Sequence, residues 1–422
     1  MTLSLSRRAD RFPERTAVVD ISEERLYAPA ETIHEDRVTY AELSATVDET
    51  ASRLAELGID AGDTVCLLTR NRIASLAVLF ACRRLGATFA PISHRLTPVT
   101  VERPFEAIDP DLVLFESAQR DLVRSIPFDR SITLEKLATV DGAKLADDGR
   151  GGIDRDRPLV ALHGSGGRPV VAFTARSLEW NCITAMVTWG LSRDETSLLV
   201  TPLSAPDGLV RVALPLLYAG GRLLLDRAFD PGDALTAIAD EDVTFLAGRT
   251  ASFRDLAAEA AFDDTIESLE RAVPDESVPE EHLDPYRVRG VSVRRAYGRL
   301  ECPTVCCQPD SDEPSDTESD ETAVGLPVPD CRVQLLDESE TAVEGSGTGR
   351  LRVSGPMVAD GYVNAAGSDD AEGEWGIKDR TNERESAADS SDEASERGRF
   401  VDGWFATGEA FRRDETGRYY RD

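Results

Sequence analysis

Two side chains in the last third of the sequence are of types that bind a flat ring and a hard cation. They lie in the run Arg295-Ala296-Tyr297-Gly298-Arg299-Leu300-Glu301. A ring such as that of Tyr297 can stack on a base, and a carboxylate such as that of Glu301 binds hard cations such as Mg²⁺. The alternative for residues 297–301 is a turn at a strand end with an incidental glutamate.

A glycine-rich run forms a second candidate binding element, Leu162-His163-Gly164-Ser165-Gly166-Gly167-Arg168-Pro169-Val170-Val171. Glycines let backbone N–H groups approach phosphate oxygens, and the hydroxyl of Ser165 can donate to them. The pattern is typical of a phosphate-binding loop between a strand and a helix. A plain turn is the alternative, because glycine-rich stretches are common in turns. His163 is interpreted as a packed or surface histidine rather than a catalytic one.

Four blocks, in their order along the chain, resemble the adenylate-forming (AMP-binding) acyl-CoA synthetase superfamily. The glycine-rich run is similar to the family's Thr-Ser-Gly-Thr-Thr-Gly-x-Pro-Lys-Gly, and residues 297–301 are similar to its Tyr-Gly-x-Thr-Glu. The third block is close to Gly-Glu-Leu-x-Val-x-Gly-Pro…Gly-Tyr, and it reads Gly349-Arg350-Leu351-Arg352-Val353-Ser354-Gly355-Pro356 followed by Gly361-Tyr362. The fourth resembles the family's last nucleotide-binding motif, and it reads Asp402-Gly403-Trp404-Phe405-Ala406-Thr407-Gly408-Glu409.

The resemblance implies an AMP-forming acyl-CoA synthetase (ligase) that uses ATP, Mg²⁺ and CoA. In this family a carboxylic acid and ATP give an acyl-adenylate, and a thiol, normally CoA, then displaces AMP. The matching positions are Gly164, Ser165 and Gly167 for phosphate, Tyr297 and Gly298 for the nucleotide, Glu301 for catalysis and Mg²⁺, and Glu409, in place of the usual Asp, for the ribose. The opening run Arg11-Phe12-Pro13-Glu14-Arg15-Thr16-Ala17 looks somewhat like the o-succinylbenzoate–CoA ligase branch. The expected partner is therefore a small carboxylic acid substrate.

Several positions depart from the family pattern. Val170 stands where the family has a lysine, and Leu300 replaces a threonine whose hydroxyl contacts phosphate. Ser204 and Ala205 replace an aromatic residue and a histidine, and residues 272–274 lack the family's Gly-Gly-Ala turn. In the family a small C-terminal domain with a catalytic lysine follows the fourth block. We expect that domain to be absent here, which makes the chain a truncated relative.

These departures leave other classes of function open. The first is a degenerate, non-catalytic relative that binds a nucleotide or an acyl group. The second is the large subunit of a split ligase, whose partner would be a separate C-terminal domain chain. A decayed gene fragment also fits, although the intact hydrophobic periodicity argues that the fold is still constrained by packing.

The elements that position these residues follow an α/β rhythm. Thr39 and Glu42 form a capping box before a helix that ends at Gly58. A strand at 64–69, a helix at 73–85 and a strand at 87–92 predict a βαβ unit of a parallel sheet. A second unit is predicted by strands at 159–162, 197–202, 221–225 and 243–247 and by helices at 178–189, 209–218 and 234–239. Short strands at 331–336 and 349–353 predict a small β-barrel-like or antiparallel subdomain.

We therefore expect the α/β class, with two parallel-sheet α/β subdomains and a small β-barrel-like subdomain. The first subdomain covers residues 1–150, the second covers 151–325 with the phosphate loop, and the small one covers 326–422. The acidic segments 309–322 and 368–399 are interpreted as surface loops, because they contain too few apolar residues to offset the entropy cost of ordering them.

Composition narrows the partners and the compartment. The chain has 78 acidic and 47 basic residues, a net charge of −31, so nucleic acids and anionic membranes are not expected as partners. An acidic excess with only three lysines is typical of halophilic proteins. No secretion signal and no apolar run of about 18 residues is present, which predicts a cytoplasmic protein.

Seven cysteines are present. Cys66, Cys82 and Cys182 lie in apolar stretches and are interpreted as buried thiols. Residues 302, 306 and 307 are a tighter cysteine group, but their spacing does not match that of zinc-finger ligands, so a metal site is disfavoured.

Overall fold

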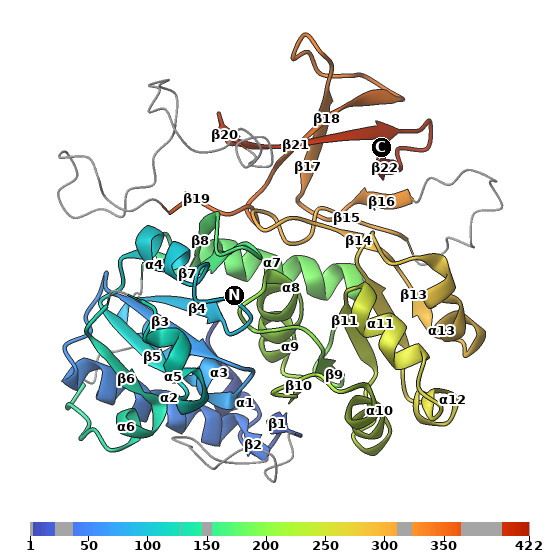
Figure 1. The fold of residues 1–422 in the computed structure, drawn as a ribbon. Coiled ribbons are helices and arrows are strands. Elements are labelled where there is room, and N and C mark those ends of the chain that lie inside the picture. Colours follow the sequence, from blue (N-terminus) through green and yellow to red (C-terminus); the bar gives the residue numbers. More distant parts are fainter. Residues whose placement is uncertain are drawn as a thin grey trace.

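The computed structural model describes residues 3–21, 37–126, 128–145, 154–309, 323–363 and 399–421. The two predicted acidic loops lie outside these ranges except at their ends. Figure 1 shows two sheets side by side in the lower part of the molecule, with helices between and around them, and a third sheet above both. Two sheets contain parallel strands and the third is antiparallel, which confirms the predicted α/β class.

The first sheet has the order β19-β8-β7-β4-β3-β5-β6. Its strands are β3 (Thr64–Thr69), β4 (Thr88–Ser93), β5 (Leu112–Phe115), β6 (Ser131–Thr133), β7 (Pro158–His163), β8 (Val170–Thr174) and β19 (Gly361–Tyr362). The predicted βαβ unit is confirmed, because β3 and β4 are parallel and flank α3 (Ile73–Leu85). The edge formed by β7, β8 and β19 is antiparallel.

The second sheet has the order β13-β12-β11-β9-β10-β1-β2. Its strands are β1 (Thr16–Asp20), β2 (Arg37–Thr39), β9 (Thr196–Leu199), β10 (Arg222–Leu225), β11 (Phe245–Gly248), β12 (Arg271–Pro274) and β13 (Ser292–Val293). All neighbours in it are parallel except β1 and β2. Parallel strands place their carboxyl ends at one edge, where the connecting loops can form a binding site.

The third sheet is antiparallel throughout, with the order β14-β15-β16-β22-β21-β18-β17, and β20 also pairs with β21. Its strands are β14 (Ala296–Tyr297), β15 (Cys306–Cys307), β16 (Ala323–Pro327), β17 (Arg332–Leu336), β18 (Gly347–Ser354), β20 (Arg399–Val401), β21 (Trp404–Arg413) and β22 (Tyr419–Arg421). Of the two forms predicted for the small subdomain, the antiparallel one is found. In the described residues its strands form an open sheet and not a closed barrel.

The sheets do not follow the expected segments 1–150, 151–325 and 326–422. Strands β1 and β2 join the second sheet, β7, β8 and β19 join the first, and β14 and β15 join the third. The reason is that pairing between distant strands leaves no local signal in the sequence. The division of the chain into three domains at these residues therefore stays a proposal.

Helices cover and separate the two parallel-containing sheets. They are α1 (Leu5–Arg11), α2 (Tyr40–Glu56), α3, α4 (Glu102–Ile108), α5 (Arg120–Val123), α6 (Leu134–Ala138), α7 (Ala175–Trp189), α8 (Pro206–Gly208), α9 (Leu214–Ala219), α10 (Pro231–Asp240), α11 (Thr250–Ala257), α12 (Phe262–Thr265) and α13 (Asp284–Val288), with a π-helical turn over Leu209–Ala213. The predicted capping box is confirmed: the hydroxyl of Thr39 accepts from the backbone of Glu42, whose carboxylate accepts from the backbone of Thr39.

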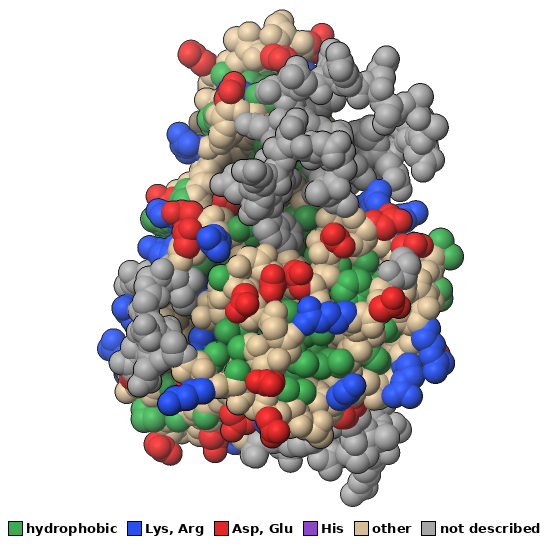
Figure 2. All heavy atoms as spheres, turned by 90° about the vertical axis from the view of Figure 1, so that its left-hand side faces the viewer, with side chains coloured by type: hydrophobic (Ala, Val, Ile, Leu, Met, Phe, Trp, Pro, Cys, Tyr) green, Lys and Arg blue, Asp and Glu red, His purple; other side chains and the backbone are tan. Residues whose placement is uncertain are grey.

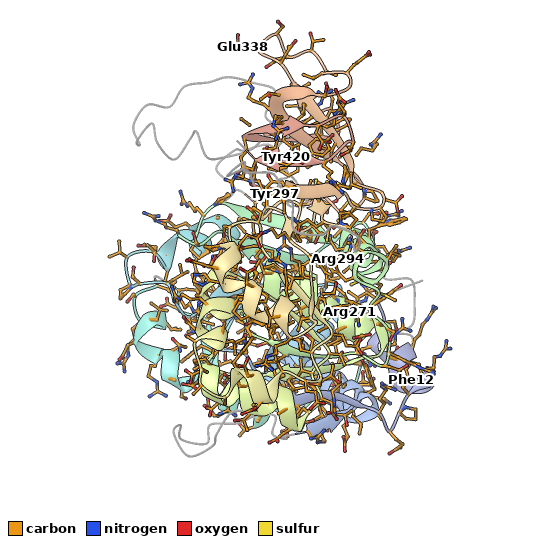
Figure 3. The ribbon with its side chains drawn as sticks, turned by 90° about the vertical axis from the view of Figure 1, so that its right-hand side faces the viewer. Phe12, Arg271, Arg294, Tyr297, Glu338 and Tyr420 are labelled. Atoms are coloured by element: carbon orange, nitrogen blue, oxygen red, sulfur yellow. The ribbon has the colours of Figure 1, made fainter. Side chains whose placement is uncertain are left out.

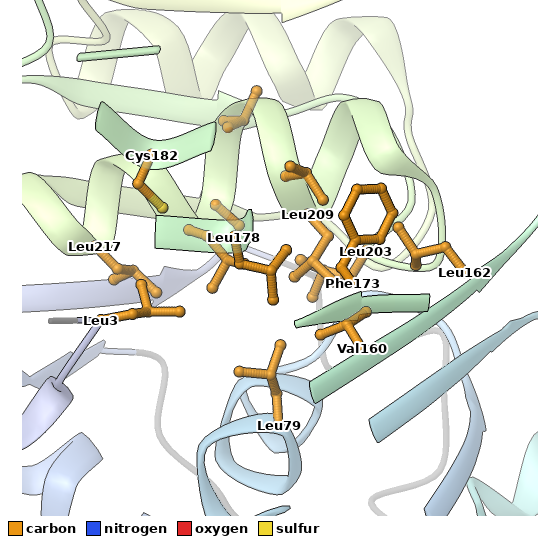
Figure 4. Packing of buried hydrophobic residues seen from close by; sticks show 14 of the residues in the cluster. Leu3, Leu79, Val160, Leu162, Phe173, Leu178, Cys182, Leu203, Leu209 and Leu217 are labelled. Atoms are coloured by element: carbon orange, nitrogen blue, oxygen red, sulfur yellow. The ribbon is translucent and has the colours of Figure 1, made fainter. Parts of the chain in front are cut away.

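The main core lies between the first two sheets and extends into the third. Figure 4 shows Leu79 of α3, Phe173 of β8 and Leu178 and Cys182 of α7 packed together with Leu217 of α9. Leu79, Phe173, Leu178 and Cys182 are completely buried. Burial of apolar surface on this scale contributes roughly 25 cal/mol for each Å² removed from water, so α7 is fixed firmly between the sheets.

Charged side chains of both signs are spread over the surface. Figure 2 views the molecule from the left-hand side of Figure 1 and shows acidic and basic groups interspersed among apolar ones. Helix α2 has polar residues outward and Leu43, Val47 and Leu54 buried, which is the amphipathic pattern that the sequence predicted. Among the described helices, none combines the length and apolar character needed to cross a membrane.

Candidate active site

The predicted nucleotide residues lie in a short hairpin where the second and third sheets meet. Strand β14 ends at Tyr297, and the chain turns over residues 298–305 into β15. The turn is closed by reciprocal backbone hydrogen bonds between Arg299 and Cys302. Gly298 is required here because a Cβ atom would lie 2.0 Å from the carbonyl oxygen of Pro303. Figure 3 shows Tyr297 at this junction, below the strand that carries Tyr420.

Glu301 is buried, with 2 % of its surface exposed. Its Oε1 accepts a hydrogen bond of 2.6 Å from the hydroxyl of Tyr362, on β19. Its Oε2 is buried without a hydrogen-bond partner, and Nε of Arg299 lies 3.8 Å away. A buried carboxylate oxygen without a donor is costly unless a cation or another donor reaches it. This donor set fits Mg²⁺, which is usually held by one or two carboxylates together with substrate phosphates.

Glu409 points into the same junction from β21. Its Oε2 accepts a hydrogen bond from the hydroxyl of Tyr297, and its Oε1 lies 2.9 Å from Nη1 of Arg299. The same Oε1 lies 2.7 Å from Nη2 of Arg421, which also pairs with Glu276 at 3.0 Å. Both oxygens are therefore occupied by side chains of this protein, and hydroxyl groups of a ligand would have to replace them.

Tyr297 does not present a free ring face in this structure. Only 1 % of its surface is exposed, and its ring meets that of Phe411 edge-on at a centroid distance of 4.9 Å. Burial, together with the negative charge of Glu409, raises the pKa of the Tyr297 hydroxyl well above its usual value. The hydroxyl is therefore protonated and donates to Glu409. Stacking of Tyr297 on adenine stays a prediction, and it requires the ring to become exposed.

The glycine-rich loop is placed differently from the expectation. It connects β7 to β8 in an antiparallel hairpin, and α7 begins only at Ala175, after β8. The predicted position directly between a strand and a helix is therefore wrong. The turn is closed by a hydrogen bond from the amide of Gly164 to Pro169 and one from the amide of Gly167 to Gly164. Those two amides are consequently engaged within the loop, whereas the described hydrogen bonds give the amide of Ser165 no acceptor.

The loop is anchored on both sides. A Cβ atom at Gly167, whose φ is +88°, would lie 2.7 Å from the carbonyl oxygen of Thr100. His163 is buried; its Nε2 accepts from the amide of Ser93 at 3.0 Å, and its Nδ1 lies 2.7 Å from the carbonyl oxygen of Gly164. The ring is therefore neutral with its proton on Nδ1, consistent with burial lowering the pKa of His163. This confirms that His163 is a packing residue.

The loop reaches the glutamates through two paired strands. Val171 of β8 pairs with Tyr362 of β19, and the hydroxyl of Tyr362 bonds to Glu301. Val170, at the family's lysine position, is buried at the start of β8. The structure thus brings Tyr297, Gly298, Glu301 and Glu409 together and connects Gly164, Ser165 and Gly167 to them through β8 and β19.

A cavity of about 440 Å³ lies beside the hairpin, at the carboxyl ends of β11 and β12. Its lining is mostly polar and includes Asp207, Arg211, Arg249, Thr250, Ala251, Asp275, Glu276, Ser277 and Gly298. Asp207 pairs with Arg211 at 3.2 Å and with Arg249 at 2.5 Å. Burial raises the pKa of Glu276. The cavity is adjacent to the predicted nucleotide residues, because Gly298 lies in its lining.

Sequence reasoning missed three side chains of this site. Arg299 lies at the variable position of the Tyr-Gly-x-Thr-Glu block, Tyr362 lies in the third block without a predicted binding role, and Arg421 lies outside the four blocks. The sequence offered one signal for two of them: Arg299 and Arg421 are charged and lie within or near the matched blocks. Their directions depend on the strand pairing, which spacing does not reveal.

The cysteines near the hairpin do not form a metal site in the described part of the chain, where no cluster of three or more His, Cys, Asp or Glu was found. All seven cysteines are buried and free, as expected for Cys66, Cys82 and Cys182. A hydrogen bond with Cys331, and then burial, raise the pKa of Cys302 well above its usual value. A thiol binds metals as the thiolate, so a raised pKa opposes metal binding.

Comparison with known proteins places this site in a family. The sequence matches the AMP-binding enzyme family over residues 5–363. Feruloyl-CoA synthase from Amycolatopsis sp is 28% identical over 386 residues, which are 91% of this chain and 72% of that protein. Indoleacetate–CoA ligase from Aromatoleum aromaticum is 28% identical over 347 residues, 78% of this chain and 67% of that protein. The 2-succinylbenzoate–CoA ligase of Bacillus licheniformis is 22% identical and covers 99% of this chain and 78% of its own length.

Solved structures show the same fold. The o-succinylbenzoate CoA synthetase of Bacillus subtilis in complex with ATP and magnesium gives a TM-score of 0.78 at 20% identity, over 100% of this chain and 79% of that one. The N-terminal domain of FACL13 from Mycobacterium tuberculosis gives 0.79 at 19% identity and covers 100% of both chains. With the family matched over residues 5–363, the chain belongs to the AMP-binding enzyme family and is an enzyme of the acid–thiol ligase type.

Proposed function

We propose that this chain activates a small carboxylic acid with ATP to an acyl-adenylate and then forms its CoA thioester. The observation that carries the proposal is the convergence of Glu301, Glu409 and Gly298 beside the cavity of about 440 Å³. The partnerless Oε2 of Glu301 supports a role for that residue in holding Mg²⁺. Mg²⁺ would supply positive charge to the phosphates of bound ATP.

In the first half-reaction an oxygen of the acid's carboxylate forms a bond to the α-phosphorus of ATP. The bond from that phosphorus to the bridging oxygen breaks, and its electron pair leaves with pyrophosphate. Glu409 would accept hydrogen bonds from the ribose hydroxyls, and Tyr362 would hold Glu301 in position through its 2.6 Å hydrogen bond. The amide and hydroxyl of Ser165 would donate to phosphate oxygens. In the second half-reaction the thiolate of CoA attacks the acyl carbon, and AMP leaves.

The substrate class that we propose is an acid with an aromatic group. Three of the matched relatives are named for feruloyl, indoleacetate and 2-succinylbenzoate, which all contain an aromatic ring. The polar cavity lining suits a compact acid that carries further hydrogen-bonding groups better than a long alkyl chain, because Asp207, Arg249 and Glu276 would remain partly desolvated against alkyl carbon.

Pyrophosphate exchange tests this proposal. The purified chain would be incubated in molar KCl with Mg²⁺, ATP, labelled pyrophosphate and a panel of ferulate, indoleacetate, o-succinylbenzoate and medium-chain fatty acids. We expect exchange with at least one aromatic acid and loss of exchange, about 100-fold or more, in Glu301→Gln. Glu338→Gln is the matched control, since Glu338 is exposed at the tip of the third sheet, away from the junction (Figure 3).

A second candidate function, nucleotide or acyl binding without catalysis, is favoured by one specific observation. Tyr297 is buried, and both oxygens of Glu409 are held by Tyr297, Arg299 and Arg421. Binding of AMP without exchange for any acid would support this candidate and contradict the stand-alone enzyme. Exchange that appears only after a separate C-terminal domain chain is added would support the split ligase.

A further inference from the structure

Arg299 lies between the two carboxylates that define the site. Its Nη1 is 2.9 Å from Oε1 of Glu409, and its Nε is 3.8 Å from Oε2 of Glu301. The guanidinium thus joins the glutamate proposed for the ribose to the glutamate proposed for Mg²⁺. In a nucleoside triphosphate the group between the ribose and the metal-bound terminal phosphates is the α-phosphate.

The backbone beneath Arg299 is fixed. The Arg299 amide donates to Cys302 at 2.9 Å, the Cys302 amide donates back at 3.2 Å, and the preceding glycine allows no larger residue. The side chain is 23% exposed, so one part of it is packed and another part is open to solvent. Burial opposes the charge, but the neighbouring carboxylates of Glu409 and Glu301 raise the pKa of Arg299, so the guanidinium stays protonated.

We infer that Arg299 binds the α-phosphate of the nucleotide, an inference that rests on the proposed function. With Glu301 holding Mg²⁺ through Oε2 and Glu409 holding the ribose, these two carboxylates would no longer be available to the guanidinium. Its planar N–H groups match two oxygens of a phosphate, a geometry in which charge-assisted hydrogen bonds are strong. The two glutamates therefore hold Arg299 in place before the nucleotide enters, and the α-phosphate replaces them.

The role explains two departures from the family pattern together. Leu300 has no hydroxyl to donate to phosphate, and Val170 has no ammonium group and is buried in β8. Arg299 supplies donors and a positive charge from the residue next to Leu300. As the acid's oxygen bonds to the α-phosphorus, negative charge grows on the phosphate oxygens, where a fixed guanidinium lowers the barrier.

Binding of AMP compared with adenosine tests the inference without relying on turnover. Isothermal titration calorimetry with AMP and with adenosine would compare the unsubstituted protein with Arg299→Gln and Arg299→Lys at one fixed KCl concentration. We expect Arg299→Gln to lose about tenfold or more in AMP affinity, while its adenosine affinity stays within about twofold. Arg299→Lys keeps the charge but not the planar fork and should retain part of the AMP affinity. Arg124→Gln, at an exposed ion pair on the surface, is the control.

The outcomes separate the inference from the proposed function. If the original chain binds neither ligand, the proposed function fails and the inference falls with it. If the original chain binds AMP and Arg299→Gln binds it equally well or more tightly, the proposed function stands and the inference alone is overturned. If Arg299→Gln does not fold, as judged by circular dichroism, the ratio of AMP to adenosine affinity in Arg299→Lys decides, because an unchanged ratio contradicts the inference.

Discussion

Two buried glutamates, Glu116 at the end of β5 and Glu301 in the turn between β14 and β15, are almost equally hidden from solvent but have very different partners. Glu116 follows β5 of the first sheet and is 1% exposed; Glu301 follows β14 and is 2% exposed. Glu116 has Nε of Arg70 at 2.7 Å on one oxygen and Nε of Arg72 at 2.8 Å on the other, with further hydrogen bonds from neighbouring side chains. Among the described residues, the hydroxyl of Tyr362 donates to Oε1 of Glu301, and Oε2 has no hydrogen-bond partner.

The comparison distinguishes a structural carboxylate from one that is prepared for a ligand. A buried charge is tolerated when opposite charges and hydrogen bonds compensate it, as they do at Glu116. An incompletely compensated charge costs free energy of folding, and such costs are typical of functional sites. Glu116 therefore has its charge compensated at the end of β5, whereas Oε2 of Glu301 is the buried oxygen to which the proposed function assigns a cation.

The largest expected effect contrasts the two glutamates in one measurement of stability. Glu116→Gln removes the carboxylate that pairs with the buried guanidinium groups of Arg70 and Arg72, and we expect a loss of about 3–5 kcal/mol in the free energy of unfolding. Glu301→Gln removes a charge that has few partners, so we expect a change below about 1 kcal/mol. Urea unfolding followed by circular dichroism measures both. Equal losses would contradict the distinction between the two sites.

The pH dependence of the same pair gives the second prediction. Burial acts to raise the pKa of Glu116, but the hydrogen bond from Arg70 and the charges of Arg72 and Arg70 lower it from 4.5 to about 2. The stabilisation is fully present above the unfolded-state pKa of 4.5 and is lost as the pH falls from 4.5 toward 2. We therefore expect the difference in unfolding free energy between the original chain and Glu116→Gln to be constant from pH 7 to about 5.5.

Below pH 4.5 that difference should fall by up to about 1.4 kcal/mol per pH unit. Because the other carboxyl groups titrate in both chains, the difference isolates Glu116. Urea unfolding at several pH values in molar KCl provides the measurement. A difference that stays constant down to pH 3.5 would show that Glu116 is not held ionised by its arginines.

Local sequence features predicted the region around Glu116 better than the region around Glu301. Strand β3 and helix α3 begin and end at the predicted residues, since periodicity and a terminal glycine act within one segment. The β7–β8 hairpin was missed because a short apolar run such as residues 170–174 cannot be told from the start of a helix by periodicity. The local sequence also does not indicate that a strand such as β1 or β19 joins a sheet whose other strands lie far away in the chain.

At the candidate site, the motif blocks selected Tyr297, Glu301 and Glu409, and the structure brings these three side chains into one junction. The blocks could not reveal the partners Arg299 and Tyr362. Those contacts depend on the pairing of β19 with β8 and on the tight turn after Gly298. The burial of Tyr297 was equally hidden, since it follows from contact with Phe411 on a distant strand.

The third prediction removes the hydroxyl of Tyr362, which donates a hydrogen bond to Glu301. Tyr362→Phe keeps the edge-on ring contact with Phe400, at a centroid distance of 5.3 Å, and removes the hydrogen bond to Glu301. We expect pyrophosphate exchange at low Mg²⁺ to fall about tenfold. Loss of a side chain that hydrogen-bonds to a metal ligand lowers metal affinity by about 10–100-fold. A Mg²⁺ titration should recover part of the rate. Tyr420→Phe, which removes a similar bond to Asp414, is the matched control and should leave exchange unchanged.

The smallest expected effect is at the solvent-exposed rim of the site. Arg421 is 44% exposed and pairs with Glu409 and Glu276. Exposed ion pairs contribute little, so Arg421→Gln should change the free energy of unfolding by less than about 1 kcal/mol. It also removes one competitor for Glu409, so adenosine affinity should rise by roughly twofold. A stability loss above about 2 kcal/mol in urea unfolding would instead make Arg421 a structural anchor, comparable to Arg70 and Arg72 around Glu116.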